Sequence, residues 1–155
     1  MTREIDDSPS TPPDLLDMPG YLARRRYQAY VAYWGKHVDP VLTGPQFSVL
    51  TVVRMFPGSD QGSMAVAVAL DNSTMADLAR RLESRGFLSR IPDASDGRRK
   101  LLYLSPEGEA VLDAATTRVA ALNGSLLSPL PEDEQVAFIR TLQRLADHWE
   151  RLASD

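Results

Sequence analysis

Apolar residues recur at helical spacing near both ends of the chain. The first amphipathic segment runs from Pro19 to about His37, and Pro40 prevents the helix from continuing because proline lacks an amide hydrogen. Two more helices are predicted after Ser105. In the first, the apolar face consists of Leu112, Ala115, Val119, Leu122 and Leu126. In the second, which begins around 131–134, it consists of Phe138, Leu142, Leu145, Trp149 and Leu152. Such faces pack against the core or against a partner helix.

The middle of the chain predicts three shorter helices. The pattern T-x-x-Q at 43–46 is a capping box that begins the first, and Pro57–Gly58 ends it. The second is predicted over 61–69. The third begins at one of the capping residues 71–74 and ends at Gly86, because glycine favours the position just after a helix.

The periodicity then changes to that of strands. Residues 87–91 and 100–104 are two short strand-like runs, and the polar, turn-rich segment 92–99 separates them. We therefore predict a β-hairpin with a basic tip. Helix, turn, helix and hairpin in this order are the winged helix-turn-helix arrangement, in which the last of the three helices enters the major groove of DNA.

Composition narrows the class of protein. The 155 residues are 43% hydrophobic and 25% charged, which is typical of one globular domain, and they include no cysteine. Disulfides and thiol chemistry are therefore excluded. No apolar run approaches the roughly 18 residues of a membrane span, and residues 1–18 lack the features of a signal peptide. We expect a cytoplasmic protein with no membrane interaction, and a loosely held arm over residues 1–18.

The net charge of −4 hides an uneven distribution. Residues 80–100 contain seven basic and three acidic residues, a net charge of +4, whereas the rest of the chain carries −8. An isolated run of charges is usually just a solvated surface. Here the run coincides with the third helix and the hairpin of the predicted winged helix, which favours contact with DNA phosphates.

Six motifs in sequence order make the chain resemble the MarR-type regulators, the multiple antibiotic resistance repressor family. They are Leu42–Thr43–x–x–Gln46–Phe47–x–Val49–Leu50, Met64–Ala65–x–x–Val68–Ala69–Leu70, Asp71–x–Ser73–Thr74–Met75, Leu82–Glu83–x–Arg85–Gly86–Phe87, Asp93–x–x–Asp96–x–Arg98–Arg99 and Leu104–Ser105–x–x–Gly108. The resemblance extends in register from about Pro19 to Leu152.

The resemblance implies a mainly helical fold with a small β-wing. It predicts a single domain over 19–152, with a winged-helix lobe at about 43–104 and dimerisation helices at about 19–38 and 105–152. It further implies a homodimer that binds a pseudo-palindromic operator in double-stranded DNA. Members of the family commonly repress transcription and release DNA when a small molecule binds.

The resemblance also assigns DNA-contacting positions. The third helix of the lobe would present its exposed start to bases and phosphates, and Arg98 would enter the minor groove, oriented by Asp96. The expected DNA-binding residues are Ser63, Ser73, Thr74, Ala76, Asp77, Arg80, Asp96, Arg98, Arg99 and Lys100. Three positions depart from the family pattern. Met64 replaces Leu, a harmless change in packing. Asp77 replaces the usual Arg or polar donor, which either loses a phosphate contact or redirects readout towards cytosine. Gly97 replaces an Arg and removes a charge from the wing.

A second group of candidate functional residues lies in the first long helix, where a run of arginines precedes several aromatic residues. One interpretation is that the aromatic rings are dimer core and the arginines a solvated face. The other is an effector pocket, in which aromatic rings stack on a ligand and an arginine meets its carboxylate or phosphate. The pocket hypothesis names Arg24, Arg25, Tyr27, Tyr30, Trp34 and Phe47.

The sequence contains little that indicates a catalytic site or a metal-binding site. His37 and His148 are the two histidines, and their spacing matches no metal-binding motif. No nucleophile triad or phosphate-binding loop stands out, so we expect neither an enzyme nor a cofactor. The predicted function is a homodimeric regulator, a repressor released by an aromatic or carboxylate-bearing ligand. The alternative is a small-molecule-binding or protein-interaction dimer that has lost DNA binding, which Asp77 and Gly97 keep open.

Overall fold

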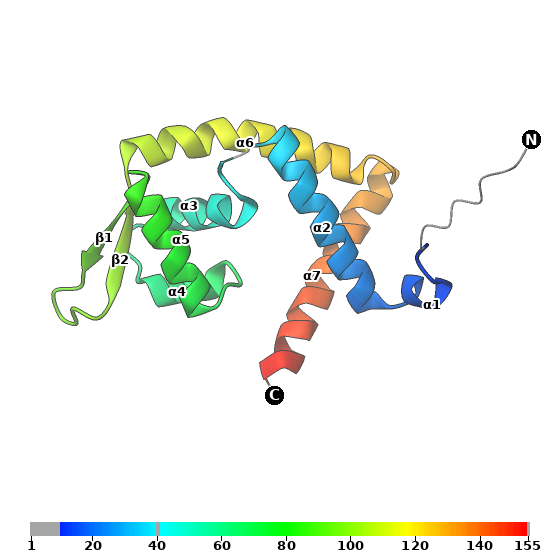
Figure 1. Cartoon of the computed structure of the whole chain (residues 1–155), viewed down its shortest axis with the longest axis horizontal. Helices are drawn as coiled ribbons and strands as arrows, with labels where there is room; N and C mark the ends of the chain where they lie inside the picture. Colours follow the sequence, from blue (N-terminus) through cyan, green and yellow to red (C-terminus); the bar gives the residue numbers. More distant parts are fainter. Residues whose placement is uncertain (1–9, 40, 155) are drawn as a thin grey trace, which may run out of the picture.

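The computed structural model describes residues 10–39 and 41–154, and Figure 1 shows a lobe with a β-hairpin on the left and long helices above it and to its right. In chain order the elements are α1 (Pro13–Leu16), α2 (Pro19–His37), α3 (Gly44–Met55), α4 (Gln61–Ala67), α5 (Asn72–Ser84), β1 (Leu88–Pro92), β2 (Lys100–Leu104), α6 (Pro106–Leu127) and α7 (Glu132–Ser154). The predicted fold class, mainly helical with a small β-wing, is confirmed.

The lobe is built from α3, α4, α5 and the hairpin around one apolar core. β1 and β2 pair antiparallel, from Leu88 opposite Leu104 to Pro92 opposite Lys100. The chain just before α4 extends this sheet, because Gly58 N–H donates to the Leu102 carbonyl at 2.8 Å. Side chains from every layer meet in the core, and those with no exposed surface include Leu50, Met75, Leu82, Leu102 and Leu112.

Capping side chains fix where the helices begin. Thr43 and Gln46 form the reciprocal capping box that the sequence predicts, and they begin α3. Asp71 accepts from Thr74 N–H and begins α5, while Ser105 accepts from Gly108 N–H and begins α6. Gly86 has φ +76° just after α5, which explains why a glycine stands there.

α6 joins the lobe to the remaining helices. Its first turn lies directly against the end of α5, since a Cβ on Gly108 would be 2.0 Å from the Phe87 carbonyl oxygen. Leu112 and Ala115 belong to the lobe core, whereas Leu122, farther along α6, packs with Trp34 and Val38 in a second cluster. Figure 1 shows α6 running along the top of the molecule from the lobe toward α2 and α7.

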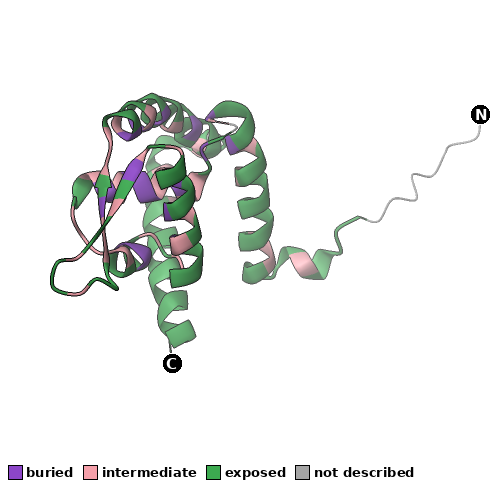
Figure 2. Cartoon of the chain, turned by 60° about the vertical axis from the view of Figure 1, so that its left-hand side comes forward, coloured by how far each residue is buried: buried purple, intermediate pink, exposed green. Residues whose placement is uncertain are grey.

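α7 is long but buries none of its residues, and it is coloured as exposed along its visible length in Figure 2. Its apolar side chains are at least two-fifths exposed at six positions, namely Val136, Ile139, Leu142, Leu145, Trp149 and Leu152. A helix with this much apolar surface in water is typical of a subunit interface.

Two sequence predictions about element bounds need correction, and one is refined. Within the arm predicted over 1–18, residues 13–16 form α1, where proline in the first turn and Asp14 near the positive end of the helix dipole favour a helical turn. Residues 1–9 lie outside the described part. α4 ends at Ala67 instead of residue 69, because Ala69 has φ +53°. The first strand is shifted by one residue, to 88–92, since Phe87 N–H bonds to Leu82 in the turn after α5.

Candidate nucleic-acid interface and aromatic cluster

The start of α5 is organised by the Asp71 carboxylate. Ser73 and Thr74 each donate a hydroxyl hydrogen bond to it at 2.5 Å, and Thr74 N–H donates at 2.8 Å. These bonds stabilise the charged carboxylate and hold the pKa of Asp71 well below its ordinary value, with the Ser73 hydroxyl the largest cause. Because both hydroxyl hydrogens point to Asp71, the outward-facing lone pairs of Ser73 and Thr74 act as acceptors.

One turn further along α5, Arg80 forms an ion pair with Asp77. The two side chains are 62% and 58% exposed, on the side of the helix away from Met75 and Ala79, which are buried. Ala76, which precedes Asp77, is half-buried. The exposed face of α5 therefore carries acceptors in its first turn and a carboxylate–guanidinium pair in the next.

At the wing tip, Arg98 extends into solvent with its side chain 94% exposed. Its Nε–H donates to Asp96 at 3.3 Å, and its backbone N–H donates to the same carboxylate oxygen at 3.1 Å. Asp96 thus contacts the arginine that the resemblance names as its partner, and the role of the pair on DNA stays a prediction. Lys100 Nζ donates to the Gly97 carbonyl at 3.4 Å.

Arg99, the next residue of the wing, lies in a different environment. It donates to Asp60 at 3.0 Å and lies 3.4 Å from Asp93. Asp60 also accepts from the Ser63 hydroxyl at 2.6 Å and from the N–H groups of Gly62 and Ser63 at 3.1 Å, which begins α4. Ser63 first and Arg99 after it lower the pKa of Asp60 to about 2. Two expected phosphate contacts, Ser63 and Arg99, therefore share one carboxylate.

Sequence reasoning missed Asp60 as a member of this site. Its signal was its place just before a predicted helix, where an aspartate is a good N-cap. Its second partner, Arg99, stands 39 residues later, and nothing local in the sequence links the two.

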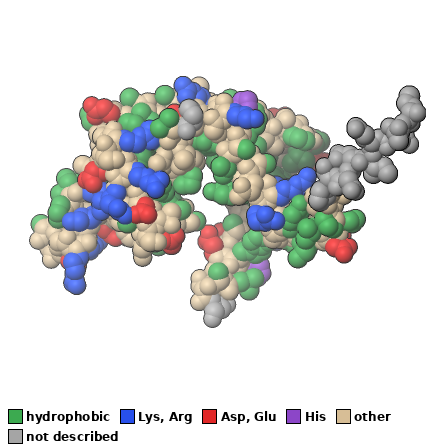
Figure 3. Space-filling view, viewed as in Figure 1, with side chains coloured by type: hydrophobic (Ala, Val, Ile, Leu, Met, Phe, Trp, Pro, Cys, Tyr) green, Lys and Arg blue, Asp and Glu red, His purple; other side chains and the backbone are tan. Residues whose placement is uncertain are grey.

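Basic side chains gather over α5 and the wing, on the left of the molecule in Figure 3. Several of them have structural partners. Arg85 donates to the Val41 carbonyl at 3.2 Å and lies 4.5 Å from the centre of the Phe87 ring. Arg90 pairs with Glu83. The run of charges at 80–100 is thus partly a framework for the lobe, and Arg80 and Arg98 point outward from it.

The aromatic residues of the pocket hypothesis come together at the junction of α2 and α3. Ring centres are 5.8 Å apart for Tyr30 and Trp34, and 5.6 Å apart for Trp34 and Phe47. Trp34 is only 4% exposed, and its indole N–H donates to the Leu42 carbonyl at 2.6 Å. Tyr27 lies 6.3 Å from Tyr30 at the exposed edge of the cluster. Burial is the main cause of a raised pKa for Tyr30.

The two arginines of the hypothesis are exposed on α2, in the turn before Tyr27. Arg24 is exposed, and its guanidinium stands 5.5 Å from the centre of the Tyr21 ring, one turn before the cluster. Arg25 is exposed as well. The structure thus brings together Tyr30, Trp34 and Phe47. Phe47 packs against both the lobe core and the second cluster, so it connects the junction to the DNA-facing lobe.

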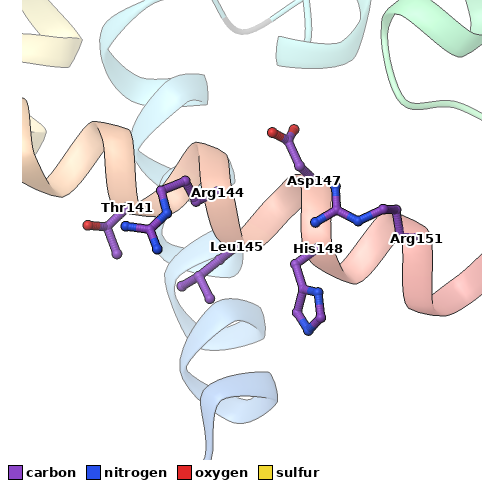
Figure 4. A pocket seen from close by; sticks show the side chains of 6 residues that line it. All are labelled: Thr141, Arg144, Leu145, Asp147, His148 and Arg151. Atoms are coloured by element: carbon purple, nitrogen blue, oxygen red, sulfur yellow. The ribbon is translucent and has the colours of Figure 1, made fainter.

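The described surface also has a shallow hollow of about 460 Å³ along α7 (Figure 4). Its lining comes from that one helix and consists of Thr141, Arg144, Leu145, Asp147, His148 and Arg151. Leu145 is one of the exposed apolar side chains of α7, so the hollow lies on the surface suited to a partner helix. Within residues 10–39 and 41–154, no cluster of three metal-ligating side chains occurs.

Comparison with known proteins places this geometry in a family. The profile of the MarR family matches residues 42–100. The transcriptional regulator HosA of Escherichia coli is 33% identical over 122 residues, which cover 79% of this chain and 90% of HosA. The chain belongs to the MarR family. It is therefore a winged-helix transcriptional regulator, as its sequence motifs imply.

Solved structures of the family agree in fold. The PcaV regulator from Streptomyces coelicolor, in complex with its natural ligand, is 40% identical, with a TM-score of 0.84 over 89% of this chain and 98% of PcaV. The transcriptional repressor CouR bound to a 23-mer DNA duplex is 29% identical, with a TM-score of 0.80 over 90% of this chain and 99% of CouR.

None of the helices in the described residues is long and apolar enough to cross a bilayer.

Proposed function

We propose that this MarR-family chain is a homodimeric repressor that binds a pseudo-palindromic operator and is released by a small aromatic or carboxylate-bearing ligand. The observation that carries the proposal is the wing arginine Arg98, which is 94% exposed and contacts Asp96, in a lobe whose helix α5 also exposes a polar face. A winged helix uses these two elements for the minor and the major groove. CouR, a repressor solved on a DNA duplex, has the same fold.

Dimerisation follows from α7. The exposed apolar positions 142, 145 and 149 recur along this helix at steps of three and four, and residues 10–39 and 41–154 leave them exposed. A second copy presents the same stripe, so a two-fold interface would bury both at once. Two lobes related by a two-fold axis then match two half-sites about 34–36 Å apart.

Ligand response would start at the aromatic cluster. Tyr30 and Trp34 come from α2, whereas Phe47 comes from α3, which is part of the DNA-facing lobe. A ring inserted beside Phe47 would move α3 relative to α2, and with it the distance between the α5 helices of the two copies, which are the helices expected to enter the major groove. Binding that favours the changed spacing would lower the population able to bind the operator.

The test is fluorescence anisotropy with duplex DNA from upstream of the chain's own gene, at two salt concentrations and with excess random competitor. We expect binding that resists competitor and weakens steeply with salt, because phosphate contacts release counterions. Arg98→Ala should weaken it several-fold, whereas Lys36→Ala, the same loss of charge on exposed α2, should not. Equal effects of the two variants would contradict the assignment of the wing. Absence of specific binding would favour a dimer without DNA function.

A further inference from the structure

The ion pair of Asp77 and Arg80 presents a definite hydrogen-bonding pattern on α5. Arg80 uses Nη2 to contact Oδ1 of Asp77. The guanidinium has further N–H donors on its planar edge, and the carboxylate has its second oxygen as an acceptor. Side by side on the exposed face of the helix, the pair offers two donors followed by one acceptor.

This pattern is complementary to one base pair in the major groove. A G·C pair shows two acceptors, guanine N7 and O6, followed by the amino donor at cytosine N4. An A·T pair places the adenine amino donor in the middle, where it would meet a donor of Arg80. From this match we infer that Asp77 and Arg80 together read one G·C pair in each half-site of the operator. Arg80 donates to guanine, and Asp77 accepts from cytosine.

Charge argues for a base contact over a phosphate contact. Asp77 neutralises Arg80, so the pair as a unit gains little from the charged DNA backbone. Its carboxylate would be repelled by phosphates, whereas a cytosine amino group would attract it. The departure of position 77 from the family pattern therefore gains a function here, as a holder of Arg80 and a reader of cytosine.

The rest of the recognition surface strengthens the assignment. Ser73 and Thr74 direct their hydroxyl hydrogens to Asp71, so their lone pairs face outward as acceptors. Among Ser73, Thr74, Asp77 and Arg80, the side chain that donates outward is Arg80. Among these four side chains, guanine recognition should accordingly concentrate at Arg80, and the acceptors of the first turn should favour amino-bearing bases.

The inference rests on the proposed DNA-binding function, and one experiment separates the two. A library of random-sequence duplexes is selected on the full-length protein and on the variants Arg80→Ala, Arg80→Lys, Asp77→Ala and Arg81→Ala. Arg81→Ala is the matched control, because it removes the same charge from the neighbouring exposed position of α5. For each variant, the slope of the logarithm of the binding constant against the logarithm of the salt concentration (the salt slope) is measured on the selected site.

We expect the unmodified protein to enrich a palindromic site with an invariant G·C pair in each half. Arg80→Ala should lose the preference at that pair, about ten-fold or more, and Arg80→Lys should not restore it, because lysine lacks the planar fork. Asp77→Ala should weaken discrimination at the same pair without weakening binding to random DNA. Arg81→Ala should enrich the unchanged site.

Two outcomes would contradict the inference about the G·C pair without contradicting the proposed DNA-binding function. One is that Arg80→Ala selects the same site with a salt slope reduced by about one, which is the signature of a phosphate contact. An enriched site without an invariant G·C pair is the other. If the unmodified protein enriches no sequence at all, the proposed DNA-binding function itself fails.

Discussion

Arg99 in the wing donates to Asp60, the residue that begins α4, with Nη2 and Oδ2 3.0 Å apart. The same carboxylate accepts from Gly62 and Ser63 in the first turn of α4. One side chain therefore starts a helix of the DNA-binding lobe and also connects the wing to it. The Asp60 carboxylate thus adds a polar connection between the wing and α4 to the packing of the apolar core.

Substitution of Asp60 should separate its two tasks. Asp60→Ala loses the cap and the wing contact, and should lower the free energy of unfolding by about 1–2 kcal/mol at pH 7. Asparagine caps helices as well as aspartate does, so Asp60→Asn keeps the cap and loses only the charge. Its stability at pH 7 should fall by less, and urea unfolding at fixed protein concentration measures both changes.

The pH dependence of the free energy of unfolding tests whether the charge of Asp60 causes this difference. The pKa of Asp60 is lowered from 3.8 to about 2 in the folded chain, so its carboxylate adds stability above pH 4, and this contribution is lost as the pH falls toward 2. The stability difference between the unmodified protein and Asp60→Asn should therefore shrink over that interval. A difference that stays constant from pH 5 to pH 2.5 would show that the charge of Asp60 does not contribute.

Local patterns explain how much of the fold could be predicted from the sequence. The capping box at 43–46, the glycine at 86 and the turn-rich segment 92–99 each act within a few residues, and their elements lie within a residue or two of the predictions. The contact between Asp60 and Arg99 joins residues that only the folded lobe brings together. No periodicity or cap signals such a pair, so this part of the site had to come from the structure.

The end of α4 shows a different limit. Ala69 N–H bonds to the Val66 carbonyl and Leu70 N–H to the Ala65 carbonyl, which is the Schellman pattern of a helix end. The residue in the left-handed conformation, at φ +53°, is Ala69, where glycine is usual. Without a glycine the sequence carried no stop signal, and the helix was predicted two residues too long.

Ala69→Gly should therefore stabilise the protein. An L-residue with a Cβ pays about 1–2 kcal/mol for the left-handed conformation, and glycine avoids most of that cost. We expect a gain of about 1 kcal/mol in the free energy of unfolding. Ala67→Gly is the matched control inside α4, where glycine should cost about 0.5–1 kcal/mol. Stability changes of the same sign in both variants would contradict the prediction.

The role of Trp34, in the aromatic cluster, could not be decided from its residue type alone. Tryptophan at position 34 suited both a dimer core and a ligand pocket, and the sequence kept both interpretations open. In the structure Trp34 is almost fully buried, and its indole N–H is bonded to the Leu42 carbonyl at 2.6 Å. This gives it a structural role at the junction of α2 and α3, whatever ligand binds beside it.

Variants with a smaller side chain at position 34 should accordingly have a lower free energy of unfolding, even when no ligand is present. Trp34→Ala should cost about 3–5 kcal/mol, because it empties the centre of the second cluster. Trp34→Phe keeps a ring but leaves the Leu42 carbonyl without this donor, at a cost of about 1–3 kcal/mol. Tyr27→Phe, at the exposed edge of the cluster, should change stability little. Thermal unfolding of the three variants would contradict this assignment if Trp34→Phe unfolds at the temperature of the unmodified protein.

The apolar stripe of α7 should hold two copies of the chain together. Leu145→Glu would place a charge in that interface, and a buried unpaired charge costs about 2–5 kcal/mol, so the dimer Kd should rise by about 30-fold or more. Arg140→Ala changes the net charge by the same amount from an exposed position of α7 on the opposite side from the stripe and should leave the dimer intact. Sedimentation velocity over a range of concentrations measures both. If Leu145→Glu sediments as the unmodified protein does, α7 is not the interface, and its exposed apolar side chains require another partner.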